Sequence, residues 1–205
     1  MRRIYIDSYV EVCTRELVEK AYKLGYQSIV CINLQQNMES HKLLTYRKVL
    51  IEAGNVSELK STLRQLNYTE YYVTVIPRSV EVARWASHDT RIDSIMLTRE
   101  NISVFDKKQF STMKYYGKPL EVSLKDVFEC KNTACSSIFK RVVFSSRSGV
   151  PLIVGSGARD WYELIPPYSL VKLLVVYFDL EPQLALLSIT DIPRQVLLRK
   201  KAYSY

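Results

Sequence analysis

Histidine is scarce in this 205-residue chain, which has only His41 and His88, and the two are far apart. A Ser–His–Asp catalytic triad needs a histidine beside its nucleophile, and no such set can be assembled from these positions. His41 falls in an expected loop. His88 falls near the end of an expected helix, where the helix dipole favours a surface role for a basic side chain. We therefore predict no catalytic residues of this kind.

The cysteines lack the spacing of a metal site. Cys13, Cys31, Cys130 and Cys135 contain no C-x-x-C pair, whereas a structural zinc site needs four clustered sulfur or nitrogen ligands. Cys31 lies inside an apolar strand pattern and is predicted to be a buried core thiol. Cys130 and Cys135 are five positions apart, the wrong interval for one helix face. These features favour a reducing, cytoplasmic setting and no protein-bound metal.

Long hydrophobic runs are also missing. The first residues carry two arginines followed closely by an aspartate, which is unlike a signal peptide. A membrane-spanning helix needs about 20 mostly apolar residues. The most apolar stretch, residues 170–189, is interrupted by Lys172, Asp179, Glu181 and Pro182. We expect no membrane association.

What the chain does contain is a repeated alternation of short Val/Ile/Leu-rich runs with helical patterns, which is typical of a parallel sheet covered by helices. No G-x-G-x-x-G or P-loop follows any run, and this removes the commonest reason for an open doubly wound sheet. We predict one α/β domain over residues 1–205, a TIM-barrel-like parallel barrel with about seven strands and surrounding helices, although roughly 250 residues is typical of such barrels. The expected strands are residues 3–10, 27–34, 43–53, 71–77, 92–98, 119–124 and 150–156.

The helical patterns have recognisable ends. Thr14 and Ser79 are expected N-caps, and Gly25 is an expected helix stop. One long helix is expected over residues 125–146. Residues 167–178 are apolar nearly all round, so that helix is expected to be buried.

The charge is strongly basic, with 29 Lys+Arg against 21 Asp+Glu and a formal net charge of +8. Such a balance favours association with polyanions, and with nucleic acid before membranes. Guanidinium groups can pair with phosphate in a bidentate manner, although each basic residue taken alone could simply belong to a solvated face. The candidate RNA-binding residues at strand ends, helix starts and the final basic cluster are Arg78, Arg84, Arg99, Lys107, Arg147, Arg159 and Arg199.

Acidic residues at the expected strand ends are few. Barrel chemistry is placed at the carboxyl ends of the strands, where Asp7 and Glu52 are expected. Two carboxylates are too few to hold a metal cluster without histidine. Asp7 could act as a general base, but at such a position it is more often a cap or a buried hydrogen-bond acceptor.

Three stretches resemble a known family, the archaeal ribonuclease P protein component 3: "RIDSIMLTRENISVFDKKQF", "VPLIVGSGARDWYELIPPYSLVKLL" and "EPQLALLSITDIPRQVLLR". The resemblance implies a TIM-barrel-like fold related to the polymerase-and-histidinol-phosphatase (PHP) metal hydrolases. In those hydrolases, a His-x-His pair and an Asp-Ala-His type triplet bind metal. The corresponding stretches here read "YIDSY" and "GSGAR", which indicates a barrel that binds rather than catalyses.

The resemblance also implies a function and partners. The chain would be a non-catalytic subunit of ribonuclease P, in which RNA with its bound Mg²⁺ removes the 5′ leader from precursor tRNA, and the protein itself would bind no cofactor. The implied partners are the ribonuclease P RNA, protein component 2 in a heterotetramer, other protein subunits and precursor tRNA. Arg84, Arg99, Lys107 and Arg147 match basic residues of the family.

The sequence departs from the family pattern in one loop. Ile165 stands where the family has an arginine, and Tyr168 replaces a basic residue. Arg159 could replace the lost charge.

Two other functions remain open. One is a stand-alone PHP-type metal-dependent phosphoesterase with unconventional ligands such as Asp7 and Glu52. The other is a barrel scaffold that binds only protein.

Overall fold

The computed structural model describes residues 3–34, 43–131 and 133–202. The expected loop over residues 35–42, with His41, lies outside this part of the chain.

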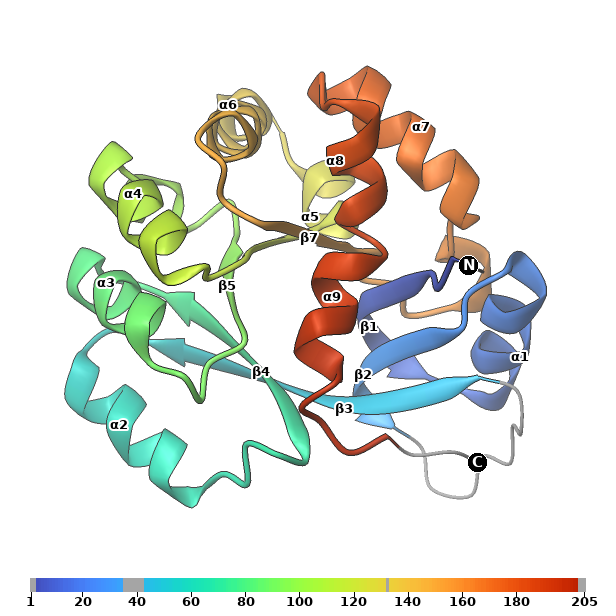
Figure 1. Ribbon diagram of the computed structural model, residues 1–205, viewed down its shortest axis with the longest axis horizontal. Coiled ribbons are helices and arrows are strands. Elements are labelled where there is room, and N and C mark those ends of the chain that lie inside the picture. Colours follow the sequence, from blue (N-terminus) through green and yellow to red (C-terminus); the bar gives the residue numbers. More distant parts are fainter. Residues whose placement is uncertain (1–2, 35–42, 132, 203–205) are drawn as a thin grey trace.

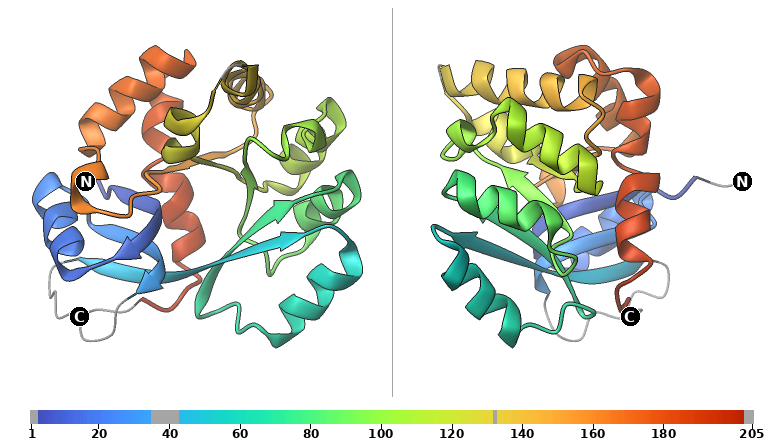
Figure 2. Two further views of the ribbon diagram at one scale, coloured as in Figure 1. Left: turned by 180° about the vertical axis from the view of Figure 1, so that it is seen from behind. Right: turned by 60° about the vertical axis from the view of Figure 1, so that its left-hand side comes forward.

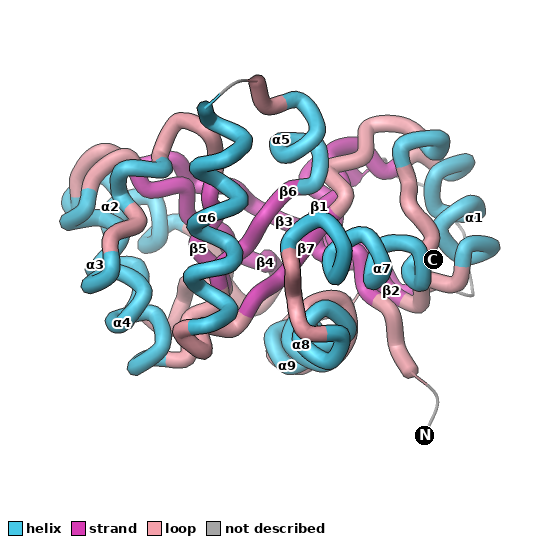
Figure 3. The backbone as a smooth tube through the Cα atoms, turned by 90° about the horizontal axis from the view of Figure 1, so that it is seen from above, coloured by secondary structure: helices cyan, strands magenta, loops and turns pink. Residues whose placement is uncertain are grey.

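Parallel strands form the centre of the molecule, and helices surround them (Figures 1 and 3). The strands pair in chain order, and every pairing is parallel. The predicted α/β, TIM-barrel-like fold with about seven strands is confirmed. The strands are β1 (Ile6–Cys13), β2 (Ser28–Leu34), β3 (Leu44–Ala53), β4 (Tyr71–Pro77), β5 (Ser94–Leu97), β6 (Leu120–Ser123) and β7 (Leu152–Gly155).

The first and last strands nearly close the barrel. Glu11 N–H donates to the carbonyl of Ala158 (2.9 Å), and Gly157 N–H donates to the carbonyl of Tyr9 (2.8 Å). Gly155 makes this approach possible, because a Cβ atom added there would lie 2.4 Å from the Cβ atom of Tyr9. The closure therefore depends on a glycine in β7.

The helices begin and end largely where the sequence predicts. Thr14 Oγ1 accepts the N–H of Leu17, Ser79 Oγ accepts the N–H of Val82, and Gly25 ends the first helix with φ 102°. The helices are α1 (Arg15–Leu24), α2 (Val56–Gln65), α3 (Val80–His88), α4 (Lys107–Tyr116), α5 (Leu124–Glu129), α6 (Thr133–Arg147), α7 (Pro167–Phe178), α8 (Pro182–Leu187) and α9 (Asp191–Leu197). Two short 3₁₀ helices, η1 (Ile102–Val104) and η2 (Trp161–Glu163), follow β5 and β7.

The last two helices cross the amino-terminal end of the barrel (Figures 1 and 2). From α9, Val196 and Leu197 pack into one cluster with Ile6, Tyr72 and Ile153 from the strands. This cluster closes the barrel floor and leaves the opposite end, where the strands finish, open to surface loops.

Two expectations about the helices were wrong. The long helix expected over residues 125–146 is divided into α5 and α6, because the backbone turns to an extended conformation at Cys130. The helix α7 buries Leu170 and Leu174, but Val176 on its outer side is 84% exposed. The continuous apolar pattern therefore gives α7 an outer face that the described chain does not cover.

The prediction of a core thiol at Cys31 was also wrong. Cys13 and Cys31 form a disulfide between the neighbouring strands β1 and β2, with their Cα atoms 5.9 Å apart. Cys130 and Cys135 form a second disulfide, with a Cα–Cα distance of 5.3 Å. The cysteines thus give no support for a reducing setting. Within the described ranges, no helix has the length and apolar character needed to cross a membrane.

Candidate functional site

The carboxyl edge of the barrel carries charged residues that pair with one another. Because β1 continues to Cys13, its acidic residue at this edge is the half-buried Glu11, and the placement of Asp7 at the strand end was wrong. The Glu11 carboxylate pairs with Lys125 at 3.3 Å and contacts Arg159. The sequence interpretation missed both Glu11 and its bridging role.

A second paired group lies at the ends of β3, β4 and β5. Arg78 Nε donates to Glu52 at 2.5 Å, and the two terminal nitrogens of Arg78 donate to Glu100. Arg99 also donates to Glu100. The hydrogen bond from Arg78 lowers the pKa of Glu52. Glu52 is therefore held as a surface ion-pair partner and not directed into the barrel.

The barrel interior contains an ion pair that the sequence interpretation also missed. Lys48 Nζ lies 2.5 Å from Glu121 Oε1, and both side chains are fully buried. Two hydroxyl groups, those of Thr74 and Ser94, donate to the other carboxylate oxygen of Glu121 at 2.9 and 2.5 Å. The ring of Tyr72 lies 4.1 Å from Lys48 Nζ. Burial lowers the pKa of Lys48, and the nearby Glu121 carboxylate opposes that shift.

Asp7 belongs to β1, lies beside this network and bonds to the segment after β7. Its Oδ1 accepts the N–H groups of Ser156 (2.9 Å) and Tyr9 (3.3 Å). Its Oδ2 has no hydrogen-bond partner in the described structure. Burial raises the pKa of Asp7 to about 6. Asp7 therefore links β1 to the segment after β7 by a buried hydrogen bond.

The two stretches that the resemblance aligns with metal ligands do lie side by side, because Asp7 bonds to Ser156. They supply a single carboxylate, and the charge of the buried Lys48 ammonium acts directly on it. Among the residues that the structure places, no group of three His, Cys, Asp or Glu side chains could hold a metal ion. A divalent cation would find too few donors among these residues. The residues present do not fit a metal.

Four of the seven predicted RNA-binding residues come from two consecutive strand–helix units. Arg78 and Arg99 share Glu100 at the carboxyl edge, as described above. Arg84 on α3 pairs with Asp106 at 2.9 Å, and Lys107 follows Asp106 at the start of α4. The structure thus brings these basic residues together in pairs, each beside an acidic residue.

The other three predicted residues are separated from these. Arg147 ends α6 and pairs with Asp179 at 3.0 Å, with both side chains largely exposed. Arg159 contacts Glu11 near β1, and Arg199 follows α9 at the amino-terminal end of the barrel. The seven residues therefore do not form one continuous site, and their RNA contacts remain a prediction.

The departures from the family pattern have clear local surroundings. Ile165 packs against the main hydrophobic core, and its carbonyl accepts the hydroxyl of Tyr26 at 2.8 Å. Tyr168 is exposed, with Lys172 Nζ 4.6 Å from its ring centre. Arg159 is engaged by Glu11, so the loop offers a charge that is already paired.

The family model for RNase P subunit p30 matches residues 5–204. The chain belongs to this family. Ribonuclease P protein component 3 of Aeropyrum pernix is 25% identical over 177 residues, which cover 81% of this chain and 82% of that protein. The chain is therefore a protein subunit of ribonuclease P, as the resemblance in the sequence predicts.

Solved structures show the same fold at low identity. A chain in a cryo-EM structure of archaeal ribonuclease P with mature tRNA matches with a TM-score of 0.78 and 14% identity, covering 95% of this chain and 90% of that chain. A histidinol phosphate phosphatase from Lactococcus lactis, solved with zinc, L-histidinol and phosphate, matches with a TM-score of 0.52 and 10% identity over 82% of this chain and 92% of that one. This chain thus shares its fold with a phosphatase that was solved with zinc, but its described residues lack the donor set that a metal needs.

Proposed function

We propose that this p30-family chain supports the RNA of ribonuclease P in removing the 5′ leader from precursor tRNA and is not itself the catalyst. The observation that carries this proposal is the buried Lys48–Glu121 pair beside Asp7, in the part of the barrel where related folds would carry metal ligands. An internal ion pair fills that space with charges that neutralise each other. The catalytic Mg²⁺ is then used by the RNA, and the protein supplies basic side chains outside the barrel.

The partners follow from the same proposal. We infer contacts with the ribonuclease P RNA, with protein component 2 in a heterotetramer, with other protein subunits and, in the assembled enzyme, with precursor tRNA. The net charge of +8 suits a role beside RNA, because basic side chains reduce the repulsion between phosphates as the RNA folds. The proposed location is the cytoplasm. The two disulfides would then be of the kind found in intracellular proteins of hyperthermophilic archaea.

Charge reversal tests the RNA-binding role. The test variant combines Arg84→Glu with Lys107→Glu. Together with Asp106, the two new side chains place three carboxylates near the start of α4. We expect this double variant to weaken binding of the ribonuclease P RNA and to lower the salt slope by roughly 0.7–0.9 for each lost phosphate contact. Arg147→Glu is expected to act in the same direction. The measurement is fluorescence anisotropy with labelled RNA over a series of salt concentrations.

A matched control separates specific contacts from total charge. Arg15→Glu matches Arg147→Glu in its change of net charge, because it replaces a similarly exposed arginine that pairs with Glu19 on α1, outside the predicted set. If the control weakened RNA binding as much as the test variants, only net charge would matter. If neither Arg84→Glu nor Arg147→Glu changed RNA binding in the assembly, the barrel would be a protein-binding scaffold.

A metal-dependent phosphoesterase is the second candidate function. The metal content of the purified chain distinguishes it from the subunit function. The purified chain is expected to hold no stoichiometric manganese, iron or zinc, because Asp7 is engaged by Ser156 and Glu52 by Arg78. Stoichiometric metal that is lost in an Asp7→Ala variant would contradict the subunit-only function.

A further inference from the structure

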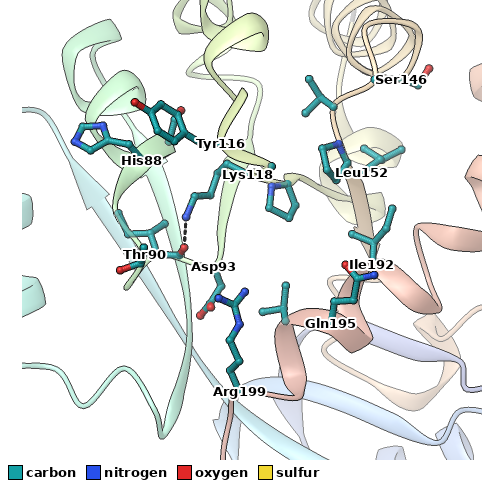
Figure 4. A pocket seen from close by; sticks show the side chains of 18 of the residues that line it. His88, Thr90, Asp93, Tyr116, Lys118, Ser146, Leu152, Ile192, Gln195 and Arg199 are labelled. Atoms are coloured by element: carbon teal, nitrogen blue, oxygen red, sulfur yellow. Dashed lines mark hydrogen bonds between the residues drawn. The ribbon is translucent and has the colours of Figure 1, made fainter. Parts of the chain in front are cut away.

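A cavity of about 400 Å³ opens beside the helices that close the barrel floor (Figure 4). It lies between the ends of α3 and α4 on one side and α8 and α9 on the other, at the amino-terminal end of the strands. This is the opposite end from the charged carboxyl edge. The volume falls within the range of about 300–1,000 Å³ that is usual for small-molecule sites.

The cavity combines an apolar wall with a basic end. Side chains from β7, the preceding loop and α9 form the wall: Val150, Pro151, Leu152, Ile192 and Val196. Lys118 and Arg199 line the same cavity, and Figure 4 shows the Arg199 side chain extending into it from below. An apolar surface that ends in two cations suits a flat organic body that carries an anionic group.

Two acidic residues lie near these cations, and Asp93 lines the cavity itself, but both carboxylates are paired with other basic residues. Asp93 is held by Lys200 at 2.6 Å, and Asp89 is held by Arg91 at 2.7 Å. Within the described residues, no carboxylate pairs with Arg199 or Lys118. The site therefore keeps a net positive charge, although Asp93 and Asp89 act electrostatically on Lys118.

Lys118 is held in place before any ligand arrives. Its ammonium donates to the carbonyls of Asp89 (2.9 Å) and Ile92, and the residue is only 8% exposed. Those two acceptors leave one N–H of the three for a ligand. Burial lowers the pKa of Lys118 to about 8; the Asp93 and Asp89 carboxylates oppose that shift, and the like charges of Arg199 and Lys200 add to it. An anion would offset this repulsion.

Aromatic rings lie at the other end of the cavity. His88 and Tyr116 line it, with their ring centres 5.8 Å apart, and Figure 4 places them on the far side of Lys118 from Arg199. Gln195 adds an amide that can both donate and accept hydrogen bonds. Aromatic faces and amides are the groups with which proteins bind unstacked bases.

We propose that this cavity binds a nucleoside monophosphate unit, with the base against the aromatic and apolar walls and the phosphate against Lys118 and Arg199. The unit could be a free nucleotide or an unstacked nucleotide within an RNA strand, which present the same chemistry. The RNA source rests on the proposed function, whereas the free-nucleotide source does not.

Calorimetric titration of the full chain tests the chemistry with AMP, GMP, CMP and UMP, and with adenosine and inorganic phosphate as half-ligands. We expect at least one mononucleotide to bind at least tenfold more tightly than either half-ligand. Arg199→Glu and Tyr116→Ala should each weaken that binding, the first by tenfold or more. Equal binding of phosphate and AMP, or no binding of any nucleotide by titration together with no crosslink in the RNA experiment below, would overturn the proposal.

The matched control is Arg194→Glu, which changes an arginine on α9 that does not line the cavity. It should alter mononucleotide affinity less than twofold. An effect as large as that of Arg199→Glu would reduce the site to general electrostatic attraction and overturn the proposal.

Crosslinking distinguishes the two sources. A single-stranded RNA that contains 4-thiouridine should crosslink to residues 116–119 or 195–199, and an excess of the bound mononucleotide should suppress the crosslink. Mononucleotide binding without any crosslink would assign the cavity to free nucleotides. If no nucleotide bound in the titration and no RNA crosslinked to the cavity, while the chain still stimulated RNA-dependent cleavage, the cavity proposal would be wrong and the proposed function would stand.

Discussion

Asp7 is a buried carboxylate whose ionisation opposes folding. Its pKa is about 6 in the folded chain, whereas an unperturbed aspartate titrates near 3.9, about two units lower. The folded state therefore retains a proton that the unfolded state releases between these values. Stability should fall as the pH rises from about 4 to about 6, by about 3 kcal/mol from this group.

Asp7→Asn removes this ionisation and keeps an oxygen for the N–H of Ser156. We expect the variant to match the wild type at pH 4 and to exceed it in stability by about 1–3 kcal/mol at pH 8. Urea unfolding across this pH range measures the difference, with the exposed Glu16→Gln as control. If the unfolding free energies of the Asp7→Asn variant and the wild type changed in parallel with pH, the raised pKa of Asp7 would be contradicted.

Lys48 and Glu121 are expected to behave as a unit. Lys48→Met leaves the Glu121 carboxylate buried with only hydroxyl donors, and this should cost about 3–5 kcal/mol of unfolding free energy. Adding Glu121→Gln removes the unpaired charge and should recover part of the loss. The measurement is a double-mutant cycle by urea unfolding. Strictly additive effects of the two changes would show that the pair is not coupled.

Among the strands, the contact between β1 and β7 is the one most sensitive to an added side chain. At Gly155, a new Cβ atom would meet the backbone N of Tyr9 at 2.6 Å, and neither strand can move without opening the β1–β7 contact. Gly155→Ala should therefore lower the melting temperature and cost about 1–3 kcal/mol. Gly54→Ala is the control, because nothing lies within 4 Å of its added Cβ atom and its φ is not left-handed. Equal stability of the two variants would show that the closure is looser than the structure describes.

Most elements could be predicted from sequence because local signals fix them. The caps at Thr14 and Ser79 and the stop at Gly25 act through neighbouring backbone groups. One of the exceptions is β1, where the register shifts between Asp7 and Val10. The strand expected over residues 3–10 is observed over Ile6–Cys13, so its carboxyl end lies beyond Asp7.

The site could be predicted less well, because its contacts join distant strands. Lys48 and Glu121 are 73 positions apart, and only the barrel brings them together. Opposite charges in the middle of two apolar strand patterns were the available signal for a buried pair. The Cys13–Cys31 disulfide could not be predicted for a related reason: Cys13 lies beyond the first predicted strand, residues 3–10, and only the pairing of β1 with β2 brings it beside Cys31.

At the scale of the whole molecule, charge is distributed unevenly between the two ends of the barrel. The carboxyl edge pairs most of its arginines with Glu11, Glu52 and Glu100. The amino-terminal end holds Lys118 and Arg199 without carboxylate partners among the described residues. The excess positive charge therefore does not gather where barrel enzymes place their chemistry. This separation agrees with a p30-family subunit that contributes binding surfaces.

The most direct test of the central claim is cleavage of precursor tRNA by the cognate ribonuclease P RNA at low Mg²⁺, with and without this chain and component 2. A parallel reaction contains both proteins and no RNA. The account predicts cleavage that requires the RNA and increases when the protein pair is added. Cleavage in the reaction without RNA, abolished by a change at Asp7, would make this chain the catalyst and contradict the account.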